Sequence, residues 1–172
     1  LEQRGQEGRE LFLLFVTLDL AQVDRKLVEK DQRRLTTKKL AQGIRSGGDA
    51  LLLVDGITSV GAMPVEMDAW GIDCLVTGSQ KALMLPPGLG FVGLGERAIK
   101  RLESVKAQGY YNLDLRRWYK SWQKNDVPFT PPVSLVRGQR VALEMIEAEA
   151  VENVCARSAK LAAAGRAAFA AM

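Results

Sequence analysis

The sequence predicts an α/β fold, because short apolar runs alternate with longer polar segments that carry apolar residues at helical spacing. The run at 50–54 is entirely apolar, as in strands that are buried on both faces of a parallel sheet. Further apolar runs follow at 72–76 and 90–94. Together they predict a mostly parallel sheet flanked by helices.

The upstream part of the chain alternates predicted strands and helices. Residues 1–10 are polar and contain glycine, which predicts a frayed end. The apolar run 11–17 predicts a buried strand, and 21–45 predicts a helix with imperfect spacing that Ser46-Gly47-Gly48 ends. The next expected elements are a strand at 50–54, a short helix at 67–70 ended by Gly71, and strands at 72–76 and 90–94.

The downstream part is predicted to be helical. Three prolines (Pro128, Pro131 and Pro132) exclude a regular helix from 125–132. The expected helices are an amphipathic one at 96–106, one at 114–124 that carries Trp118, Tyr119 and Trp122, one at 133–146, and an alanine-rich one at 151–172.

Composition and charge narrow the classes of partner. The chain has 172 residues, of which 47% are hydrophobic, enough for the core of one domain. Its net charge of +4 is not gathered into a stripe, so we expect no nucleic-acid partner. The apolar stretch 11–20 is shorter than the roughly 20 residues that span a bilayer, so we expect no membrane partner.

Histidine and cysteine usage narrows the chemistry. The chain has no histidine, which excludes histidine metal sites and any Ser-His or Cys-His catalytic pair within it, and we expect no metal. Cys74 and Cys155 lie far apart in apolar or helical surroundings. They are expected to be buried or semi-buried thiols outside any disulfide, in a reducing compartment, which predicts a cytoplasmic protein.

An acid and a lysine follow two of the predicted strands. Asp55 ends the apolar run 51–54, and Lys81 follows 72–76 in the loop Gly78-Ser79-Gln80-Lys81. Ligands of α/β sheets bind at the carboxyl ends of the strands, where both residues fall. A lysine that forms a Schiff base and an acid that pairs with a pyridine nitrogen are the anchors of pyridoxal phosphate. The pair therefore predicts pyridoxal 5′-phosphate chemistry.

Ordinary interpretations of these residues stay open. The motif around Lys81, taken alone, is explained as a surface lysine on a loop, because short motifs match often by chance, and it is Asp55 that favours the cofactor interpretation. Asp55 is also explained as a cap or turn residue before Gly56. The apolar residues before Asp55 favour a buried carboxylate that needs a partner.

Three more side chains are candidates for phosphate binding. Ser79 and Gln80 offer a hydroxyl and an amide beside the lysine, and neither adds charge. Thr130 precedes the helix expected from Val133. It is predicted either to cap that helix or to face an anion there.

With these residues identified, the chain resembles the class V aminotransferases of the fold-type I pyridoxal phosphate enzymes. The resemblance is greatest to the alanine–glyoxylate and serine–pyruvate (or serine–glyoxylate) aminotransferases, and it runs from about 50 to 147. The matching motifs, in order, are Leu51-Leu52-Leu53-Val54-Asp55-Gly56-Ile57-Thr58-Ser59-Val60-Gly61, Trp70-Gly71-Ile72-Asp73, Thr77-Gly78-Ser79-Gln80-Lys81-Ala82-Leu83, Pro86-Pro87-Gly88 and Pro128-Phe129-Thr130-Pro131-Pro132-Val133.

The resemblance implies a role for each candidate. Lys81 would form the Schiff base and then move the proton, and Asp55 would pair with the pyridine nitrogen. Ile57 would pack on the ring, and Gln80, with Ser79, would hold the phosphate. The family forms homodimers, so Thr130 would reach the neighbouring subunit's phosphate. Tyr110, Tyr111 and Trp118 would lie near that interface.

The resemblance also implies a partial version of the family's fold. Residues 1–132 would form part of the cofactor-binding large domain, with 1–49 matching weakly. Residues 133–172 would be interface and connecting helices that lead towards an absent small domain. Family members are longer, and their strand near 14–17 leads into a loop with cofactor-binding hydroxyls. Here that loop is replaced by Leu18-Asp19-Leu20-Ala21-Gln22-Val23.

Two functions from different classes follow. The first is an aminotransferase that moves an amino group from a small amino acid (alanine or serine) to a 2-oxo acid such as glyoxylate or pyruvate. The second is a truncated or diverged relative without catalysis, which serves as a structural or interaction subunit. Cysteine desulfuration is disfavoured, since that branch places a histidine before the lysine. Aminoethylphosphonate aminotransferases stay a further possibility.

Overall fold

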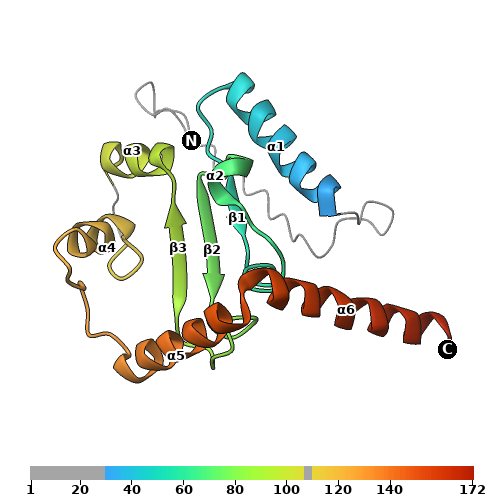
Figure 1. Cartoon of the computed structure of the whole chain (residues 1–172). Coiled ribbons are helices and arrows are strands. Elements are labelled where there is room, and N and C mark those ends of the chain that lie inside the picture. Colours follow the sequence, from blue (N-terminus) through green and yellow to red (C-terminus); the bar gives the residue numbers. More distant parts are fainter. Residues whose placement is uncertain (1–29, 107–109) are drawn as a thin grey trace, which may run out of the picture.

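The computed structural model describes residues 30–106 and 110–172, with side chains from residue 37 onward (Figure 1). The strand predicted at 11–17, the segment 18–23 and the first residues of the helix predicted at 21–45 lie outside the described residues. At the centre is a three-stranded sheet in the order β1-β2-β3. Its strands are β1 (Leu53–Asp55), β2 (Cys74–Gly78) and β3 (Gly90–Leu94).

The α/β class is confirmed, but the sheet is mixed where a mostly parallel one was expected. β1 and β2 are parallel, with Asp55 opposite Val76. β2 and β3 are antiparallel, with Gly78 opposite Gly90. The reason is the connection, because residues 79–89 contain no helix and the chain turns back at the edge where β2 ends.

The bounds of two strands differ from the prediction. β1 covers 53–55 where 50–54 was expected, and β2 covers 74–78 where 72–76 was expected. The carbonyl of Leu52 already accepts hydrogen bonds from the amides of Asp73 (2.9 Å) and Cys74 (3.1 Å). β3 has the predicted bounds.

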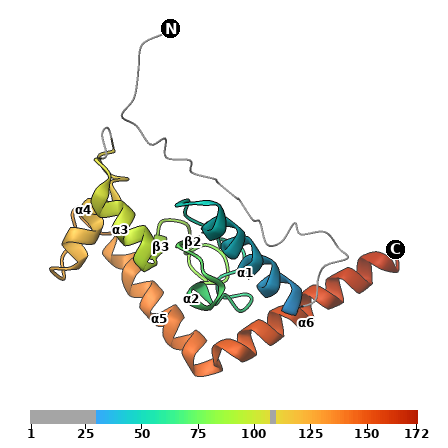
Figure 2. The ribbon, with the colours of Figure 1, turned by 90° about the horizontal axis from the view of Figure 1, so that it is seen from above.

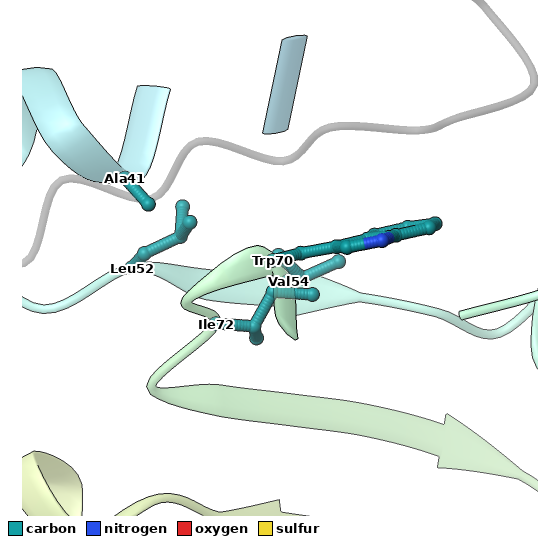
Figure 3. Close-up of a cluster of buried hydrophobic side chains, with 5 residues drawn as sticks. All are labelled: Ala41, Leu52, Val54, Trp70 and Ile72. Atoms are coloured by element: carbon teal, nitrogen blue, oxygen red, sulfur yellow. The ribbon is translucent and has the colours of Figure 1, made fainter. Parts of the chain in front are cut away.

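A hydrophobic cluster joins β1 to two helices. α1 (Lys30–Gly47) and α2 (Met67–Trp70) pack beside the sheet. Figure 3 shows the buried side chains that meet there, which are Ala41, Leu52, Val54, Trp70 and Ile72. The prediction that Gly71 ends α2 is confirmed: Gly71 has a φ of 73°, and its amide donates to the carbonyl of Asp68.

Buried charge fixes the opposite end of the strands from the predicted site. Asp73 is 3% exposed, and its Oδ2 accepts from Leu52 N (2.8 Å) and Arg97 Nη1 (2.9 Å). Arg97 lies on α3 (Glu96–Ser104) and also donates to the carbonyl of Ala50 (3.0 Å). The carboxylate therefore holds the start of β1 against α3.

Helices follow α3 to the end of the chain. α4 (Leu115–Trp122) is capped by Asp114, whose side chain accepts from the amide of Arg116 (3.1 Å). The irregular segment predicted at 125–132 is confirmed. α5 (Val133–Glu149) has Pro132 at its cap position without a side-chain hydrogen bond, so the prediction that Thr130 caps this helix is wrong. The last helix is α6 (Val151–Ala170).

The last two helices meet at an angle and α6 leads away from the sheet (Figure 2). A second cluster ties them to the body: Leu83, Ile146 and Val154 are buried, and Phe91 of β3 packs against them. Residues from both sides of position 132 therefore share a core. The predicted division into 1–132 and 133–172 stays a prediction.

Cys74 and Cys155 are both buried and outside any disulfide, as expected. Burial, and next the charge of Asp73, raise the pKa of the Cys74 thiol. Among the helices of the described ranges, none combines the length and the apolar character needed to cross a bilayer.

Candidate active site

The carboxyl ends of β1 and β2 bring the predicted site residues to one edge of the sheet. Asp55 is the last residue of β1, and Ser79 follows the last residue of β2. Because the two strands are parallel, both ends lie at the same edge, where ligands of such sheets bind. Asp55, Ile57, Ser79, Gln80 and Lys81 all belong to this edge.

Asp55 forms a turn with its own chain. Its Oδ1 accepts a hydrogen bond from the amide of Ile57 (2.9 Å), which is the turn interaction typical of aspartate. The side chain is exposed, so the expectation of a buried carboxylate is wrong for this structure. Oδ2 has no hydrogen-bond partner within the described ranges, and the carboxylate therefore keeps the capacity to accept from a ligand.

Gly56 joins this turn to β2. Its amide donates to the carbonyl of Val76 (2.7 Å), and its own carbonyl accepts from Thr77 Oγ1 (3.3 Å). A Cβ at Gly56 would lie 2.9 Å from both Leu75 Cδ1 and Val60 Cγ2, closer than such atoms approach. The turn after β1 therefore has a fixed position against β2, and glycine is needed for that approach.

Gly78 brings the two halves of the site together. A Cβ there would lie 2.6 Å from Gln80 Oε1 and 2.8 Å from Ile57 Cδ1. The side chains of Ile57 and Gln80 therefore both lie over the missing Cβ. The sequence pattern did not single out this glycine as a site residue; its place between a strand and the lysine is the only signal for it.

Ser79 lies inside the loop that carries the lysine. Its side chain is fully buried. Oγ donates to the carbonyl of Pro86 (2.7 Å) and accepts from the amide of Leu89 (3.3 Å). A hydroxyl has a single proton, so a contact from Ser79 to a phosphate oxygen would need this proton to leave Pro86. Direct phosphate binding by Ser79 stays a prediction.

Lys81 is exposed at the start of the loop. Its carbonyl accepts from the amide of Met84 (3.0 Å), a residue with a φ of 63°. Its ammonium group forms no ion pair with a carboxylate in the part of the chain that the structure describes. The amine is therefore available to a ligand at the same edge as Asp55.

Helix α5 holds the far side of this loop, a feature that the sequence reasoning missed. Gln139 is 4% exposed, and its Nε2 donates to the carbonyl of Leu83 (3.4 Å). Gly138 faces Leu85, whose Cδ2 would lie 3.3 Å from a Cβ at that position. The only sequence signal was a glycine and a glutamine inside a helix. The lysine loop is thus packed against a helix that begins just after Thr130.

Thr130 is exposed and separate from the other site residues. No hydrogen bond joins it to them within the described ranges. The preceding residue, Phe129, is fixed by aromatic contacts, with ring centroids 5.3 Å from Tyr111 and 5.7 Å from Trp118. The guanidinium of Arg117 lies 5.5 Å from the centre of the Phe129 ring. Thr130 therefore stands beside an exposed aromatic surface.

The residues at this edge fit pyridoxal phosphate at several points. A carboxylate suits a protonated ring nitrogen, an amine suits the aldehyde, and the amide of Gln80 can donate to phosphate oxygens. Ile57, whose aliphatic side chain lies beside Gln80 over Gly78, suits packing against the face of a flat ring. No group of three or more potential metal ligands occurs among the described residues.

Comparison with known proteins identifies the family. Residues 34–172 match the family described as Aminotransferase class-V. L-aspartate–glyoxylate aminotransferase of Paracoccus denitrificans is 44% identical over 119 residues, which are 69% of this chain and 30% of the relative. Serine–glyoxylate aminotransferase of Methylorubrum extorquens is 41% identical over 133 residues, 73% of this chain and 32% of the relative. A Synechococcus protein named soluble hydrogenase, small subunit, is 41% identical over 129 residues, which are 75% of this chain and 33% of the relative.

Solved structures agree on the fold. Alanine–glyoxylate aminotransferase from Nostoc has a TM-score of 0.64 and 33% identity, over 69% of this chain and 32% of that one. An aspartate aminotransferase of subgroup IV from Thermus thermophilus has a TM-score of 0.62 and 36% identity, over 70% of this chain and 33% of that one. The chain spans about a third of the length of the relatives it matches. It belongs to the class-V aminotransferase family.

Proposed function

We propose that this chain carries the cofactor centre of a pyridoxal phosphate-dependent aminotransferase. The amino group moves from a small amino acid, alanine or serine, to a 2-oxo acid such as glyoxylate or pyruvate. The observation that carries the proposal is the convergence of Ile57 and Gln80 over Gly78, at the edge where β1 ends in Asp55 and Lys81 follows β2.

Each residue has a role that its position supports. Asp55 Oδ2 accepts from the ring nitrogen, Ile57 packs on the ring face, and Gln80 donates to the phosphate. Lys81 Nζ would hold the cofactor by condensing with its aldehyde, with loss of water, and the amine would take and return the proton during the transfer. The bound cofactor supplies an aldehyde that condenses with amines and a ring that withdraws electrons from the substrate carbon.

The names of the relatives support the identity of the amino acceptor more than that of the amino donor. Glyoxylate recurs in them, whereas the donor is aspartate in one, serine in another and alanine in a third. We therefore take glyoxylate as the first acceptor to test.

A homodimer completes the proposal. Tyr111 and Trp118 are exposed and pack against Phe129, so they form an aromatic surface beside Thr130. Aromatic residues are enriched at protein interfaces. A second copy that docks on this surface would bring Thr130 to its phosphate. The two buried cysteines, which form no disulfide, support a reducing compartment such as the cytoplasm.

The function is tested with the purified chain, added pyridoxal phosphate and amino donors. Alanine, serine and aspartate are each incubated with glyoxylate, and the glycine formed is measured by mass spectrometry. We expect glycine from at least one donor and none from Lys81→Arg, which keeps the charge but not a condensing amine. Catalysis is contradicted if the wild-type chain binds the cofactor but forms no glycine from glyoxylate, and no alanine from pyruvate with serine or aspartate as donor.

A second candidate function is a non-catalytic interaction subunit. Two observations favour it: relatives of similar identity are named as hydrogenase subunits, and the aromatic surface beside Thr130 is exposed. This candidate predicts a stable complex with another chain and no covalent binding of the cofactor. Borohydride trapping of pyridoxal phosphate on Lys81 separates the two candidates.

A further inference from the structure

We infer that Ser79 is the positioning residue for Lys81: its buried hydroxyl closes the loop 79–89 and thereby fixes the amine that follows two positions later. The inference rests on the proposed function and adds to it a residue whose role is distinct from phosphate binding. Ser79 touches neither substrate nor cofactor in this role.

The loop is closed by four hydrogen bonds that all involve Ser79. Its amide donates to the carbonyl of Leu89 (3.1 Å), and its carbonyl accepts from the amide of Leu85 (3.0 Å). Its hydroxyl donates to Pro86 O (2.7 Å) and accepts from Leu89 N (3.3 Å). One residue thus binds three others along the loop, while its side chain is fully shielded from water.

This closure holds backbone that is unfavourable alone. Met84 has a φ of 63°, which few residues other than glycine adopt. Such conformations persist only where the surrounding structure enforces them. Within the loop, the two hydrogen bonds of the Ser79 hydroxyl help to hold this backbone in place. Gln139 of α5, which lies outside the loop, adds one hydrogen bond to the carbonyl of Leu83.

A closed loop matters for Lys81 because an ordered amine binds with a smaller loss of conformational entropy. If the loop opens, ordering it has to accompany each attachment of the cofactor, which weakens binding. This weakening is much larger for a ligand that bonds to Nζ than for a ligand that is held only through its ring and its phosphate. This difference separates positioning of Lys81 from direct phosphate binding by Ser79.

Ser79→Ala removes both hydroxyl bonds, and Ser59→Ala is the matched control. Ser59 is also buried (2% exposed), but its Oγ has no hydrogen-bond partner among the described residues. Hydrogen exchange of the cofactor-free protein is measured first. We expect the Leu89 amide to exchange about tenfold faster in Ser79→Ala, from the loss of about one net hydrogen bond, while α3 is unchanged. Ser59→Ala is expected to match the wild type.

The second measurement compares two cofactor forms by titration. Pyridoxal phosphate bonds to Lys81, whereas pyridoxamine phosphate has the same ring and phosphate but no aldehyde. In Ser79→Ala we expect the Kd of pyridoxal phosphate, divided by the Kd of pyridoxamine phosphate, to rise by about tenfold. The reason is the same loss of about one net hydrogen bond. If Ser79→Ala does not fold, Ser79→Cys replaces it, because a thiol has similar size and is a weak donor.

The outcomes are distinct. An unchanged ratio together with weaker binding of both forms means that Ser79 holds the phosphate, and it overturns the inference. An unchanged exchange rate at Leu89 overturns it as well. A wild-type chain that binds neither form overturns the proposed function, and the inference with it. A shifted ratio with faster loop exchange supports both.

Discussion

The side chains of Ile57 and Gln80 meet over Gly78, although they follow different strands. Ile57 Cδ1 lies 2.8 Å and Gln80 Oε1 lies 2.6 Å from the position that a Cβ on Gly78 would occupy. Parallel pairing of β1 with β2 makes this possible, because it sets both strand ends at one edge. A methyl group at this point therefore tests whether the two residues act on one ligand.

Gly78→Ala is expected to keep the fold and weaken cofactor binding. The added methyl displaces the ends of two side chains that can move, so unfolding in urea is expected to change by about 1 kcal/mol or less. The Kd for pyridoxal phosphate is expected to rise by about tenfold or more, because two contacts move together. Gly90→Ala is the matched control: Gly90 is opposite Gly78 in β3, and its Cβ would meet nothing within 4 Å. Equal affinities of the two variants would contradict the shared site.

Asp55→Asn and Asp55→Ala separate the two interactions of this carboxylate. Asparagine keeps an oxygen for the amide of Ile57, but it loses the charge that pairs with the ring nitrogen. In both variants the Kd for pyridoxal phosphate is expected to rise by a factor of about ten or more relative to the wild type, because a charge-assisted hydrogen bond is lost. Only alanine is expected to lower stability, by about 1 kcal/mol. Normal cofactor affinity in Asp55→Asn would show that Asp55 serves only the turn.

Arg97→Ala is expected to destabilise the protein without affecting the site. It removes the shortest ion pair of buried Asp73 and a bond to Ala50 at the opposite end of the strands. The free energy of unfolding, from urea titration, is expected to fall by about 1–3 kcal/mol. Arg101→Ala, one turn further along α3, breaks a pair with Asp49, whose side chain is 86% exposed, and is expected to cost about 0–1 kcal/mol. Equal costs would contradict the role of Asp73 as a buried clamp.

Cys74 is expected to react slowly with iodoacetamide in the folded protein. Burial, then the charge of Asp73, raise the pKa of this thiol, so little thiolate is present at pH 8. Alkylation of Cys74, followed by peptide mass spectrometry, is expected to be slower by about tenfold or more than in urea. A rate equal to that of the unfolded chain would contradict it.

The raised pKa of Cys74 also makes the free energy of unfolding depend on pH in the alkaline range. A raised pKa favours the neutral thiol in the folded state, so its contribution is complete below the unfolded pKa of about 8.5 and is lost as pH rises. Between pH 7 and pH 10, the unfolding free energy of the wild type is therefore expected to fall relative to that of Cys74→Ala. A difference that stays constant would exclude this linkage.

Local signals in the sequence predicted the elements well where one residue decides the backbone. Gly71 ends α2, and the prolines keep 125–132 irregular, because positive φ and the missing amide act without help from tertiary structure. The direction of β3 could not be read in this way. Its apolar residues suit either direction, and the short connection 79–89 decided the pairing.

The site was predictable as a set of residues but not as a set of contacts. The order of strand ends placed Asp55 and Lys81 at one edge, as the parallel pairing of β1 with β2 requires. The exposure of Asp55 and the inward direction of the Ser79 hydroxyl depend on how the following turn and loop close. These closures involve residues that carry no chemical signal of their own, such as Pro86 and Leu89.

The central claim is tested most directly by trapping the cofactor on the chain. The protein is incubated with pyridoxal phosphate, reduced with borohydride, digested and mapped by mass spectrometry. The account predicts a single major adduct on Lys81, absent from Lys81→Arg and diminished in Asp55→Asn. No adduct, or adducts spread over exposed lysines such as Lys100 and Lys124, would contradict the assignment of this edge of the sheet as a pyridoxal phosphate centre.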